Sequence, residues 1–352
     1  TIDHVNPEAP WPELERLAAE TAANGKTLAE RLAIYPAYAR DLGRWVAPEL
    51  VKATLDHLDG EGFARGPDRW STGTAGENVP GLASGGVAPG VARDDLDHVL
   101  AKARKGQRLE EDEIVRLFAV RGEAVGRVAA ADEVRRGAKG AAVTYVVNRN
   151  INYTNVCSYR CQFCAFSKGK MSENLRGKPY VLDLDEIERR AREAWERGGT
   201  EVCLQGGIHP AYTGETYLGI CRRINESVPG LHIHAFSPLE VWQGAATLGV
   251  SLEAFLAEVK AAGLSSLPGT AAEVLDDEVR RIICPDKINT AQWFEVMEAA
   301  HGVGLRSTAT IMFGHVDGPR NWARHLLAVR DLQAVTGGFT EFVPLPFVAH
   351  EA

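Results

Sequence analysis

The sequence has little that would point to a membrane, a nucleic acid or a secreted context. Its 352 residues include no apolar stretch long enough to cross a bilayer and no segment resembling a signal peptide. The net charge of −8, without a dense run of lysine or arginine, argues against a nucleic-acid surface. We therefore expect a cytoplasmic protein that has neither a membrane nor a nucleic acid as its partner.

Cysteine is also scarce, with six residues in the chain, which is too few at this length to suggest a disulfide framework. Cys203, Cys221 and Cys284 are scattered in apolar contexts, and we expect them to be buried small side chains. The other three cysteines lie close together in one stretch. A reducing compartment suits both groups.

The clustered cysteines form the pattern C-x-x-x-C-x-x-C at Cys157, Cys161 and Cys164, with Phe163 just before the last of them. Three thiolates so close together suit one iron–sulfur cube and leave one of its four irons without a protein ligand. A structural zinc site normally has four protein ligands, but no further Cys or His follows until Cys203. The pattern therefore predicts a cluster whose open iron can take an exogenous chelator. Zinc, or chance clustering of buried cysteines, is the alternative.

Chain length suits two units or one large barrel, and composition suggests three segments before the cysteines. Residues 1–59 are expected to be helical, and residues 93–140 to be a helical lead-in. Residues 60–92 are rich in Gly, Pro, Ser and Thr, which indicates a linker, with a mobile catalytic lid as the alternative. The expected helices are Trp11–Asn24, Thr27–Pro36, Val46–Leu58, Arg93–Lys105 and Glu110–Arg136.

Strands and helices alternate regularly from residue 141 to residue 352. The expected strands are Val143–Val147, Glu201–Leu204, His232–Phe236, Ser265–Leu267, Ser307–Phe313 and Phe339–Pro346. The expected helices are Leu184–Arg197, Gly214–Ser227, Leu252–Ala262, Ala271–Cys284, Thr290–Val303 and Arg320–Val335. This order predicts an α/β fold, a partial TIM-like (β/α)6 barrel, with a doubly wound parallel sheet as the alternative.

In either architecture, ligands bind at the carboxyl ends of the strands, and several informative residues follow strands there. Gln205, Gly206 and Gly207 follow the second strand, and Ser237 and Glu240 follow the third. The glycine pair permits unusual dihedral angles and close approach of the backbone to a ligand, although a tight turn explains it equally well. Glu240 could bind a ribose hydroxyl or a cation, or could be an exposed loop carboxylate.

The remaining polar residues of this region are expected to be structural. The histidines are not spaced like a helical metal pair, so we expect satisfied structural side chains at His209, His232, His234 and His315. Three arginines of the last helix, Arg320, Arg324 and Arg330, suggest a solvated helix face.

The cysteine pattern, with an aromatic residue before its last cysteine, resembles that of the radical S-adenosylmethionine (SAM) enzymes. In that family the methionine amine and carboxylate of SAM chelate the open iron of a four-iron, four-sulfur (4Fe-4S) cluster. An electron from the cluster cleaves the sulfonium and releases a 5′-deoxyadenosyl radical. The resemblance therefore implies an enzyme with two cofactors, the 4Fe-4S cluster and SAM, and a separate electron donor.

Longer runs resemble one subgroup of that family over roughly Glu110–Ala352. They are YVVNRNINYTNVCSYRCQFCAFSK, QGGIHP, HAFSPLE, LPGTAAEVLDDEVR and PLPF. The subgroup contains the enzymes that join tyrosine to a ribityl pyrimidine on the path to deazaflavin coenzyme F-420. It also contains two menaquinone-pathway enzymes that act on futalosine-type compounds. The cysteine loop is most similar to that of the tyrosine-using enzymes.

The resemblance implies a reaction in which the radical abstracts hydrogen from L-tyrosine and a 4-hydroxybenzyl fragment adds to 5-amino-6-(D-ribitylamino)uracil. It assigns the three cysteines to the cluster, Gln205, Gly206 and Gly207 to the SAM amine, and Ser237 and Glu240 to ribose contacts. It identifies no tyrosine-binding residues, for which Tyr153 and His315 are the only candidates. A futalosine-type radical SAM enzyme and a non-catalytic metal-binding module remain the alternatives.

The first 36 residues extend this resemblance. The run DHVNPEAPWPELERLAAETAANGKTLAERLAIYP is similar to the tail of the partner radical SAM module in the fused deazaflavin synthases. We therefore expect a fragment that lacks most of the first module and the end of the second, and whose partner is that other radical SAM module.

Overall fold

The computed structural model describes the chain in several stretches. They are residues 14–28, 36–39, 41–46, 51, 54–55, 58, 62–63, 93–120, 134, 137, 146–159, 161, 163–164 and 179–347. The chain divides into two compact units, residues 1–86 and 87–352, and the division falls inside the segment expected to be a linker. None of the described helices is long and apolar enough to cross a bilayer.

The first unit contains three short helices among its described residues. They are α1 (Leu14–Ala23), α2 (Pro36–Ala39) and α3 (Leu42–Trp45). The helix α1 lies within the range expected at Trp11–Asn24. The helix expected at Thr27–Pro36 falls mostly outside the described residues. The one expected at Val46–Leu58 is described only in part: Val51, Thr54 and Leu55 are helical, whereas its first residue, Val46, is extended.

The second unit begins with α5 (Arg93–Arg104) and α6 (Glu111–Ala119). The single helix expected from Glu110 to Arg136 is wrong at Val120, which is extended and ends α6. Its β-branched side chain and the nearby Gly122 both weaken helix continuation. Beyond Val120, residues 121–133 lie outside the described stretches.

A six-stranded parallel sheet forms the centre of the second unit, and its spatial order is the sequence order. The strands are β1 (Asn148–Asn152), β2 (Glu201–Gln205), β3 (His232–Ala235), β4 (Leu264–Leu267), β5 (Arg306–Phe313) and β6 (Phe339–Pro346). A doubly wound sheet would reverse its order at a switch point. The sequential order therefore selects the partial barrel over that alternative.

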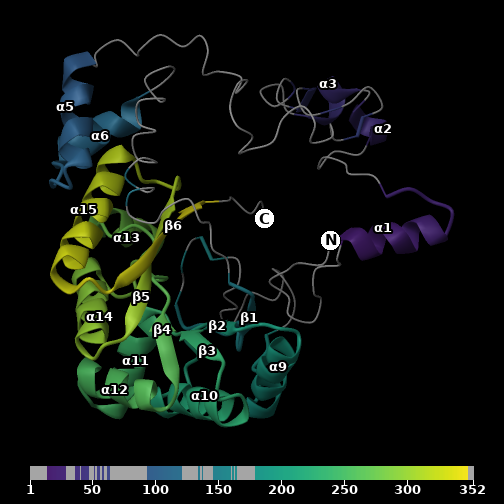
Figure 1. Ribbon diagram of the computed structural model, residues 1–352, viewed down its shortest axis with the longest axis vertical. Coiled ribbons are helices and arrows are strands. Elements are labelled where there is room, and N and C mark those ends of the chain that lie inside the picture. Colours follow the sequence, from purple (N-terminus) through teal and green to yellow (C-terminus); the bar gives the residue numbers. More distant parts are fainter. Residues whose placement is uncertain are drawn as a thin grey trace. The chain divides into compact units, whose positions relative to one another are not determined.

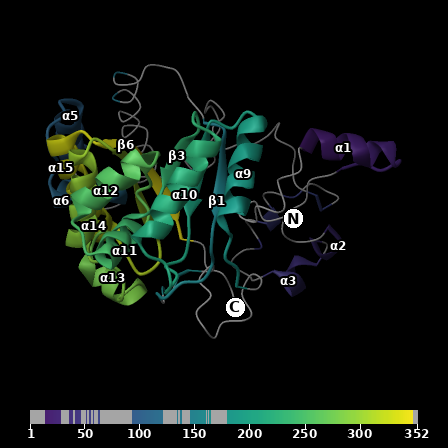
Figure 2. The ribbon, with the colours of Figure 1, turned by 90° about the horizontal axis from the view of Figure 1, so that it is seen from below.

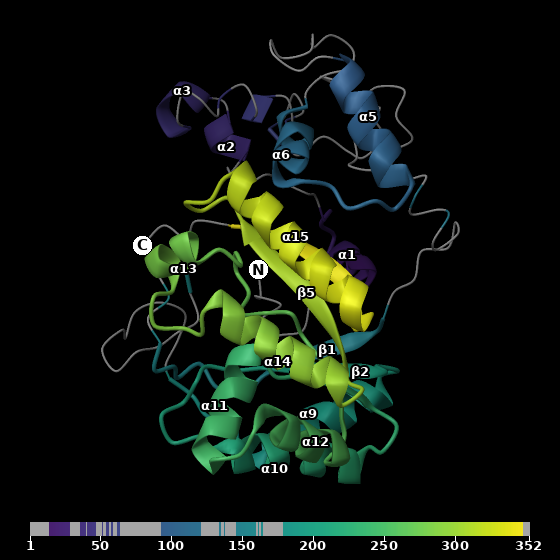
Figure 3. The same ribbon diagram turned by 90° about the vertical axis from the view of Figure 1, so that its left-hand side faces the viewer.

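Helices cover the outer side of this curved sheet (Figures 1 and 2). They are α9 (Leu184–Glu196), α10 (Gly214–Ser227), α11 (Pro238–Leu248), α12 (Leu252–Ala261), α13 (Asp277–Ile283), α14 (Thr290–Gly302) and α15 (Pro319–Thr336). Figure 3 shows α14 and α15 running along β5. Alternate strand residues such as Val202, Leu204, Ile233 and Ala235 are fully buried and share one core cluster with helix residues. Burying one such aliphatic side chain is worth about 1.5–3 kcal/mol.

Three elements of the barrel differ from the sequence-based expectation. The first strand is the polar segment Asn148–Asn152 rather than Val143–Val147, of which Val146 and Val147 are outside any strand and exposed. This strand lies at the edge of the sheet and has only one buried residue, Ile151, so it lacks the apolar run of an inner strand. The helix α11 was not expected at all.

The third difference is the late start of α13, which was expected to begin at Ala271. Ala271 and Glu273 have positive φ angles of 58° and 46°, a left-handed conformation that interrupts a helix. The helix begins only after Asp276, whose carboxylate accepts a hydrogen bond from the Glu278 N–H at 3.0 Å.

The arginines of α15 are not a simple solvated face. Arg320 pairs with Glu111 of α6 at 2.6 Å, and Arg324 pairs with Asp276 at 3.1 Å. Arg324 also pairs with Glu111 at 3.3 Å, and Arg108 pairs with Asp331 at 2.9 Å. The pairs that involve Glu111 and Arg108 join the helical lead-in to the barrel, whereas the pair of Arg324 with Asp276 lies within the barrel. Each exposed pair contributes little by itself.

Candidate functional site

The cysteine loop follows β1 and is joined by backbone hydrogen bonds to the loop that follows β2. The Gly207 N–H donates to Thr154 O at 3.0 Å, and the Ser158 N–H donates to Ile208 O at 2.8 Å. The Ile208 N–H also donates to the Sγ of Cys157 at 3.3 Å. The two stretches that the sequence placed at the carboxyl edge of the sheet therefore form one structural unit.

The glycine pair has tight surroundings. A Cβ at Gly206 would lie 2.3 Å from the Tyr153 ring, and a Cβ at Gly207 would lie 2.2 Å from Val156 O and 2.9 Å from Cys157 Cβ. Neither glycine has a positive φ, so the expectation of unusual dihedral angles is wrong. Close backbone approach is present, and it is directed toward Tyr153 and the cysteine loop. Contact of this pair with SAM stays a prediction.

Glu240 connects the ends of three strands. Its carboxylate accepts hydrogen bonds from the N–H of Ser237 at 2.6 Å, from the N–H of Gly206 at 3.2 Å and from the Tyr153 hydroxyl. The side chain is 1% exposed, so the alternative of an exposed loop carboxylate is wrong. Burial raises the pKa of Glu240, and these hydrogen bonds oppose that rise. Glu240 also forms the capping box of α11 with Ser237.

An ion pair that sequence reasoning missed lies beside the second cysteine. Lys287 and Glu273 are paired at 2.7 Å with little exposure, and the Lys287 ammonium lies 5.3 Å from the centre of the Phe163 ring. The pKa of Cys161 is raised to about 12, chiefly by burial, and nearby Lys287 opposes the rise. Glu273 and Lys287 carry no spacing signal, because only the left-handed turn before α13 brings them together.

The donor chemistry of this loop suits an iron–sulfur cluster. Cys157, Cys161 and Cys164 are all free thiols of intermediate burial, and the Cys164 N–H donates to Cys161 O at 3.2 Å in a tight turn. Among the residues that the structure describes, no three Cys, His, Asp or Glu side chains are gathered closely enough to hold a metal ion. The thiols of Cys157, Cys161 and Cys164 fit a cluster by their chemistry and their shared loop, although they are not drawn together around a common point.

The two tyrosine-binding candidates have different surroundings. Tyr153 is fully buried, and its ring lies against Gly206. His315 is partly buried, its ring lies 4.5 Å from that of Phe347, and its Nδ1 has no hydrogen-bond partner within the described stretches. Tyr153 therefore belongs to the packed core that supports Gly206, whereas His315 lies in the loop after β5.

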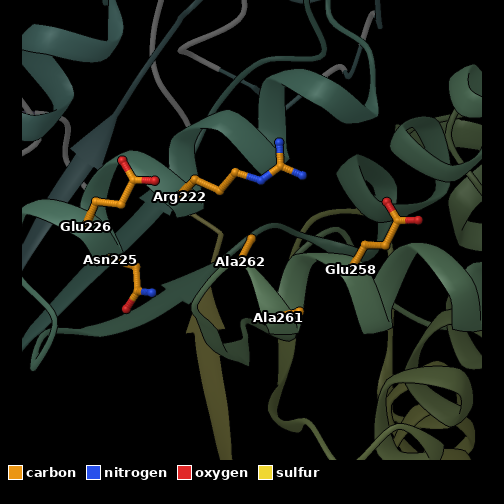
Figure 4. A pocket seen from close by; sticks show the side chains of 6 residues that line it. All are labelled: Arg222, Asn225, Glu226, Glu258, Ala261 and Ala262. Atoms are coloured by element: carbon orange, nitrogen blue, oxygen red, sulfur yellow. The ribbon is translucent and has the colours of Figure 1, made fainter.

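The hollow drawn in Figure 4 is not part of this arrangement. It lies on the outer helices and is lined by Arg222, Asn225 and Glu226 of α10, by Glu258 and Ala261 of α12, and by Ala262. None of the residues that the sequence singled out contributes to it.

Residues 151–327 match the Radical SAM superfamily, which implies a 4Fe-4S cluster and SAM. The FO synthase of Streptomyces coelicolor is 42% identical over 389 aligned positions, which cover 99% of this chain and 44% of that protein. The chain therefore spans less than half of the length of this relative.

A further relative and a solved structure of the same fold are more nearly matched in length. The 5-amino-6-(D-ribitylamino)uracil--L-tyrosine 4-hydroxyphenyl transferase of Methanoculleus marisnigri is 48% identical over 261 residues, or 74% of this chain and 69% of that protein. The crystal structure of methylornithine synthase (PylB) shares the fold, with a TM-score of 0.55 and 20% identity over 72% of this chain and 68% of that one. This chain belongs to the radical SAM superfamily and, within it, to the family of the FO synthases and their tyrosine 4-hydroxyphenyl transferase relatives.

Proposed function

We propose that this chain joins the 4-hydroxybenzyl part of L-tyrosine to 5-amino-6-(D-ribitylamino)uracil in the biosynthesis of the deazaflavin FO. The observation that carries the proposal is the match to the M. marisnigri transferase, whose name states both substrates and of which this chain covers 69%. The likeness to FO synthase supports the same pathway.

The cofactors would lie where the cysteine loop meets the loop after β2. Cys157, Cys161 and Cys164 would hold the 4Fe-4S cluster, which together with SAM supplies a 5′-deoxyadenosyl radical. Gly207 lies next to Cys157, and the backbone carbonyls of Gln205, Gly206 and Gly207 would accept hydrogen bonds from the SAM amine. The protein's own part is then to position these loops and to keep water from the radical.

Ser237 and Glu240 are the weaker candidates for contacts with the SAM ribose. Ser237 is 8% exposed, and the carboxylate of Glu240 is engaged by Ser237, Gly206 and Tyr153. Glu240 would therefore act mainly by holding the Gly206 backbone in place.

Two partners complete the proposal. Ring closure to the deazaflavin needs a second radical event, and this sequence has a single cysteine triplet. We assign that event to another radical SAM module and the supply of electrons to a separate donor.

Substrate dependence of SAM cleavage tests the proposal. The reconstituted chain should form 5′-deoxyadenosine with tyrosine and the aminouracil present, and substantially less when tyrosine is replaced by phenylalanine. Cleavage that responds to a futalosine-type substrate instead would assign the chain to the menaquinone route. A chain that binds zinc and no labile sulfide would be a metal-binding module without radical chemistry.

A further inference from the structure

The concave face of the sheet carries polar side chains that the proposed cofactor site does not use. Val202, Leu204, Ile233 and Ala235 are buried among the outer helices, so the residues that alternate with them face the inside of the partial barrel. On β2 and β3 these inward residues are Glu201, Cys203, Gln205, His232 and His234.

Strand β4 adds a serine to this face by means of a register shift. Ile233 pairs with Leu264, but His234 pairs with Ser266, so Ser265 is the extra residue between them. The Ser265 hydroxyl serves the backbone, because it accepts a hydrogen bond from the Ile233 N–H at 3.1 Å. The Ser266 hydroxyl instead lies 2.7 Å from Nε2 of His232 and 2.7 Å from Nδ1 of His234.

This geometry fixes what the two imidazoles offer to a ligand. A hydroxyl has one proton, so Ser266 donates to one neutral imidazole and accepts from the other. The remaining ring nitrogens, Nδ1 of His232 and Nε2 of His234, are then one donor and one acceptor. Within the described stretches neither has a hydrogen-bond partner; the His232 side chain is 45% exposed, and Nε2 of His234 is not among the buried atoms that lack a partner. Burial lowers the pKa of His234, which keeps its imidazole neutral at neutral pH.

The charges of this face select the class of ligand. The inward positions of β2 to β4 include no lysine or arginine, and Glu201 lies beside His232 with 3.8 Å between Oε2 and Nε2. Arg306 pairs with Ser266 on the neighbouring strand β5, but its guanidinium donates to Gly337 O. A carboxylate or phosphate would therefore find no unengaged positive partner on β2 to β4 and would meet a carboxylate. A neutral chain of hydroxyl groups, each both donor and acceptor, suits a face that presents one donor, one acceptor and a carboxylate.

We propose that His232, His234 and Ser266 form a hydroxyl-binding site inside the barrel, which takes the ribityl chain of the aminouracil. The inference rests on the proposed function. His232 and His234 lie on β3, on the amino-terminal side of Ser237, which caps α11 after the strand has ended. A ligand bound in this way points its pyrimidine ring toward the cysteine loop and its polyol toward the amino-terminal ends of β2 and β3. The sequence predicts satisfied structural histidines at both positions, and each does have one ring nitrogen bonded to Ser266; the proposal gives the other ring nitrogen of each to the ligand.

A ligand truncation combined with a residue truncation tests the site. The probes are 5-amino-6-(D-ribitylamino)uracil and 5-amino-6-(methylamino)uracil, measured by equilibrium dialysis on the reconstituted chain with SAM and without reductant. We expect the wild type to prefer the ribityl compound at least about tenfold, since several hydrogen bonds depend on the polyol. Ser266→Ala and His234→Leu should each reduce that preference at least about threefold and leave the affinity for the methyl compound nearly unchanged.

Ser265→Ala is the matched control, because it removes a neighbouring hydroxyl that does not face the barrel interior, and it should keep the wild-type preference. An equal preference in wild type, Ser266→Ala and His234→Leu would overturn the site, as would a wild type without preference. The proposed function is tested separately by adduct formation from tyrosine and the aminouracil. A wild type that forms the adduct but lacks the preference would overturn only the inference. A wild type that prefers the ribityl compound but forms no adduct would overturn only the proposed function.

Discussion

At the scale of single residues, the six cysteines fall into two groups that differ in what surrounds them. Cys157 accepts a hydrogen bond from the Ile208 N–H in the loop shared with Cys161 and Cys164, whereas Cys203 lies within β2 and Cys221 is fully buried in the core. Cys284 ends α13 and packs in the same apolar cluster as Cys161, but it is 1% exposed. Only the three loop cysteines are both close together in one segment and partly exposed, so we assign the iron–sulfur cluster to them.

We therefore expect Cys157→Ala, Cys161→Ala and Cys164→Ala each to abolish reductive SAM cleavage and to lower bound iron and sulfide after anaerobic reconstitution. Cys203→Ala, the control, should retain both, because the half-buried Cys203 side chain takes no part in the loop. Normal 5′-deoxyadenosine formation in any one of the three loop variants would exclude the cluster assignment.

Gly207 makes the closest backbone approach in the loop after β2. In Gly207→Ala the new methyl group would meet Val156 O at 2.2 Å and Cys157 Cβ at 2.9 Å, so the cysteine loop must move. We expect markedly reduced cluster loading, measured as iron and sulfide per chain. Gly219→Ala is the control, because its Cβ meets only Leu184 at 3.9 Å. That variant should load normally and gain up to about 1 kcal/mol of stability within α10. Equal loading of the two variants would show that the contact is not needed.

At the scale of elements, the buried carboxylate of Glu240 joins the segment after β1 to the ends of β2 and β3. Tyr153→Phe removes the hydroxyl that donates to this carboxylate and leaves a buried oxygen with fewer partners. We expect a loss of about 1–3 kcal/mol in the free energy of unfolding, measured by chemical denaturation. The matched control is Tyr212→Phe, because its hydroxyl has no hydrogen-bond partner in the described part of the chain, and it should change stability by less than about 0.5 kcal/mol. If both variants unfold alike, the Glu240 connection does not stabilise the fold.

His325 joins α15 to the turn before α13. Its Nδ1 accepts a hydrogen bond from the Leu275 N–H at 2.9 Å, and the ring is fully buried. Burial, with a smaller contribution from Arg280, lowers the pKa of His325 from 6.5 to about 3. Between pH 6.5 and about 3, His325 is therefore protonated in the unfolded chain but neutral in the folded chain. The contribution of His325 is fully present above pH 6.5 and is lost as the pH falls from 6.5 toward about 3.

As the pH falls below 6.5, we expect protonation of His325 in the unfolded chain to lower the free energy of unfolding of the wild type by up to about 1.4 kcal/mol per pH unit. His325→Asn keeps an acceptor for the Leu275 N–H but cannot titrate. Its free energy of unfolding should therefore fall less than that of the wild type between neutral pH and a pH near the ordinary pKa of carboxyl groups. The measurement is the free energy of unfolding of both proteins at the two pH values. Parallel losses in the two proteins would contradict the role given to His325.

How far the sequence predicts each element depends on how that element is stabilised. The helix α10 and the strand β6 have the predicted bounds, because cap residues and breakers mark their ends. The strand β1 was misplaced because an edge strand needs few apolar residues. The helix α11 was missed, although Ser237, Pro238 and Glu240 form a capping box with proline in the first turn. That pattern could have predicted it.

The same limit applies to the candidate site. The order of strands predicts that the cysteine loop and Gly206–Gly207 meet at one edge of the sheet, and the structure confirms that they do. The bond between Tyr153 and Glu240 joins residues 87 positions apart, and no local pattern signals such a contact. The pair of Lys287 and Glu273 depends on left-handed residues in a turn, which apolar periodicity does not reveal.

At the scale of the whole molecule, one cysteine triplet limits the chain to one radical step. With tyrosine and the aminouracil, we expect the coupled adduct and no fluorescent deazaflavin until a second radical SAM module is supplied. Fluorescence of the product mixture measures this directly. Fluorescent product from this chain alone would show that the division of labour between the two modules is wrong.

The central claim is that this chain transfers the aromatic part of tyrosine to the ribitylamino pyrimidine. The most direct measurement is mass spectrometry of the products formed by the anaerobically reconstituted chain with SAM, reductant, the aminouracil and ring-labelled tyrosine. The account predicts an adduct that carries the whole labelled ring, in amounts that match 5′-deoxyadenosine, and no adduct from Cys161→Ala. Cleavage of SAM without a labelled adduct, or an equal yield of adduct from Cys161→Ala, would contradict it.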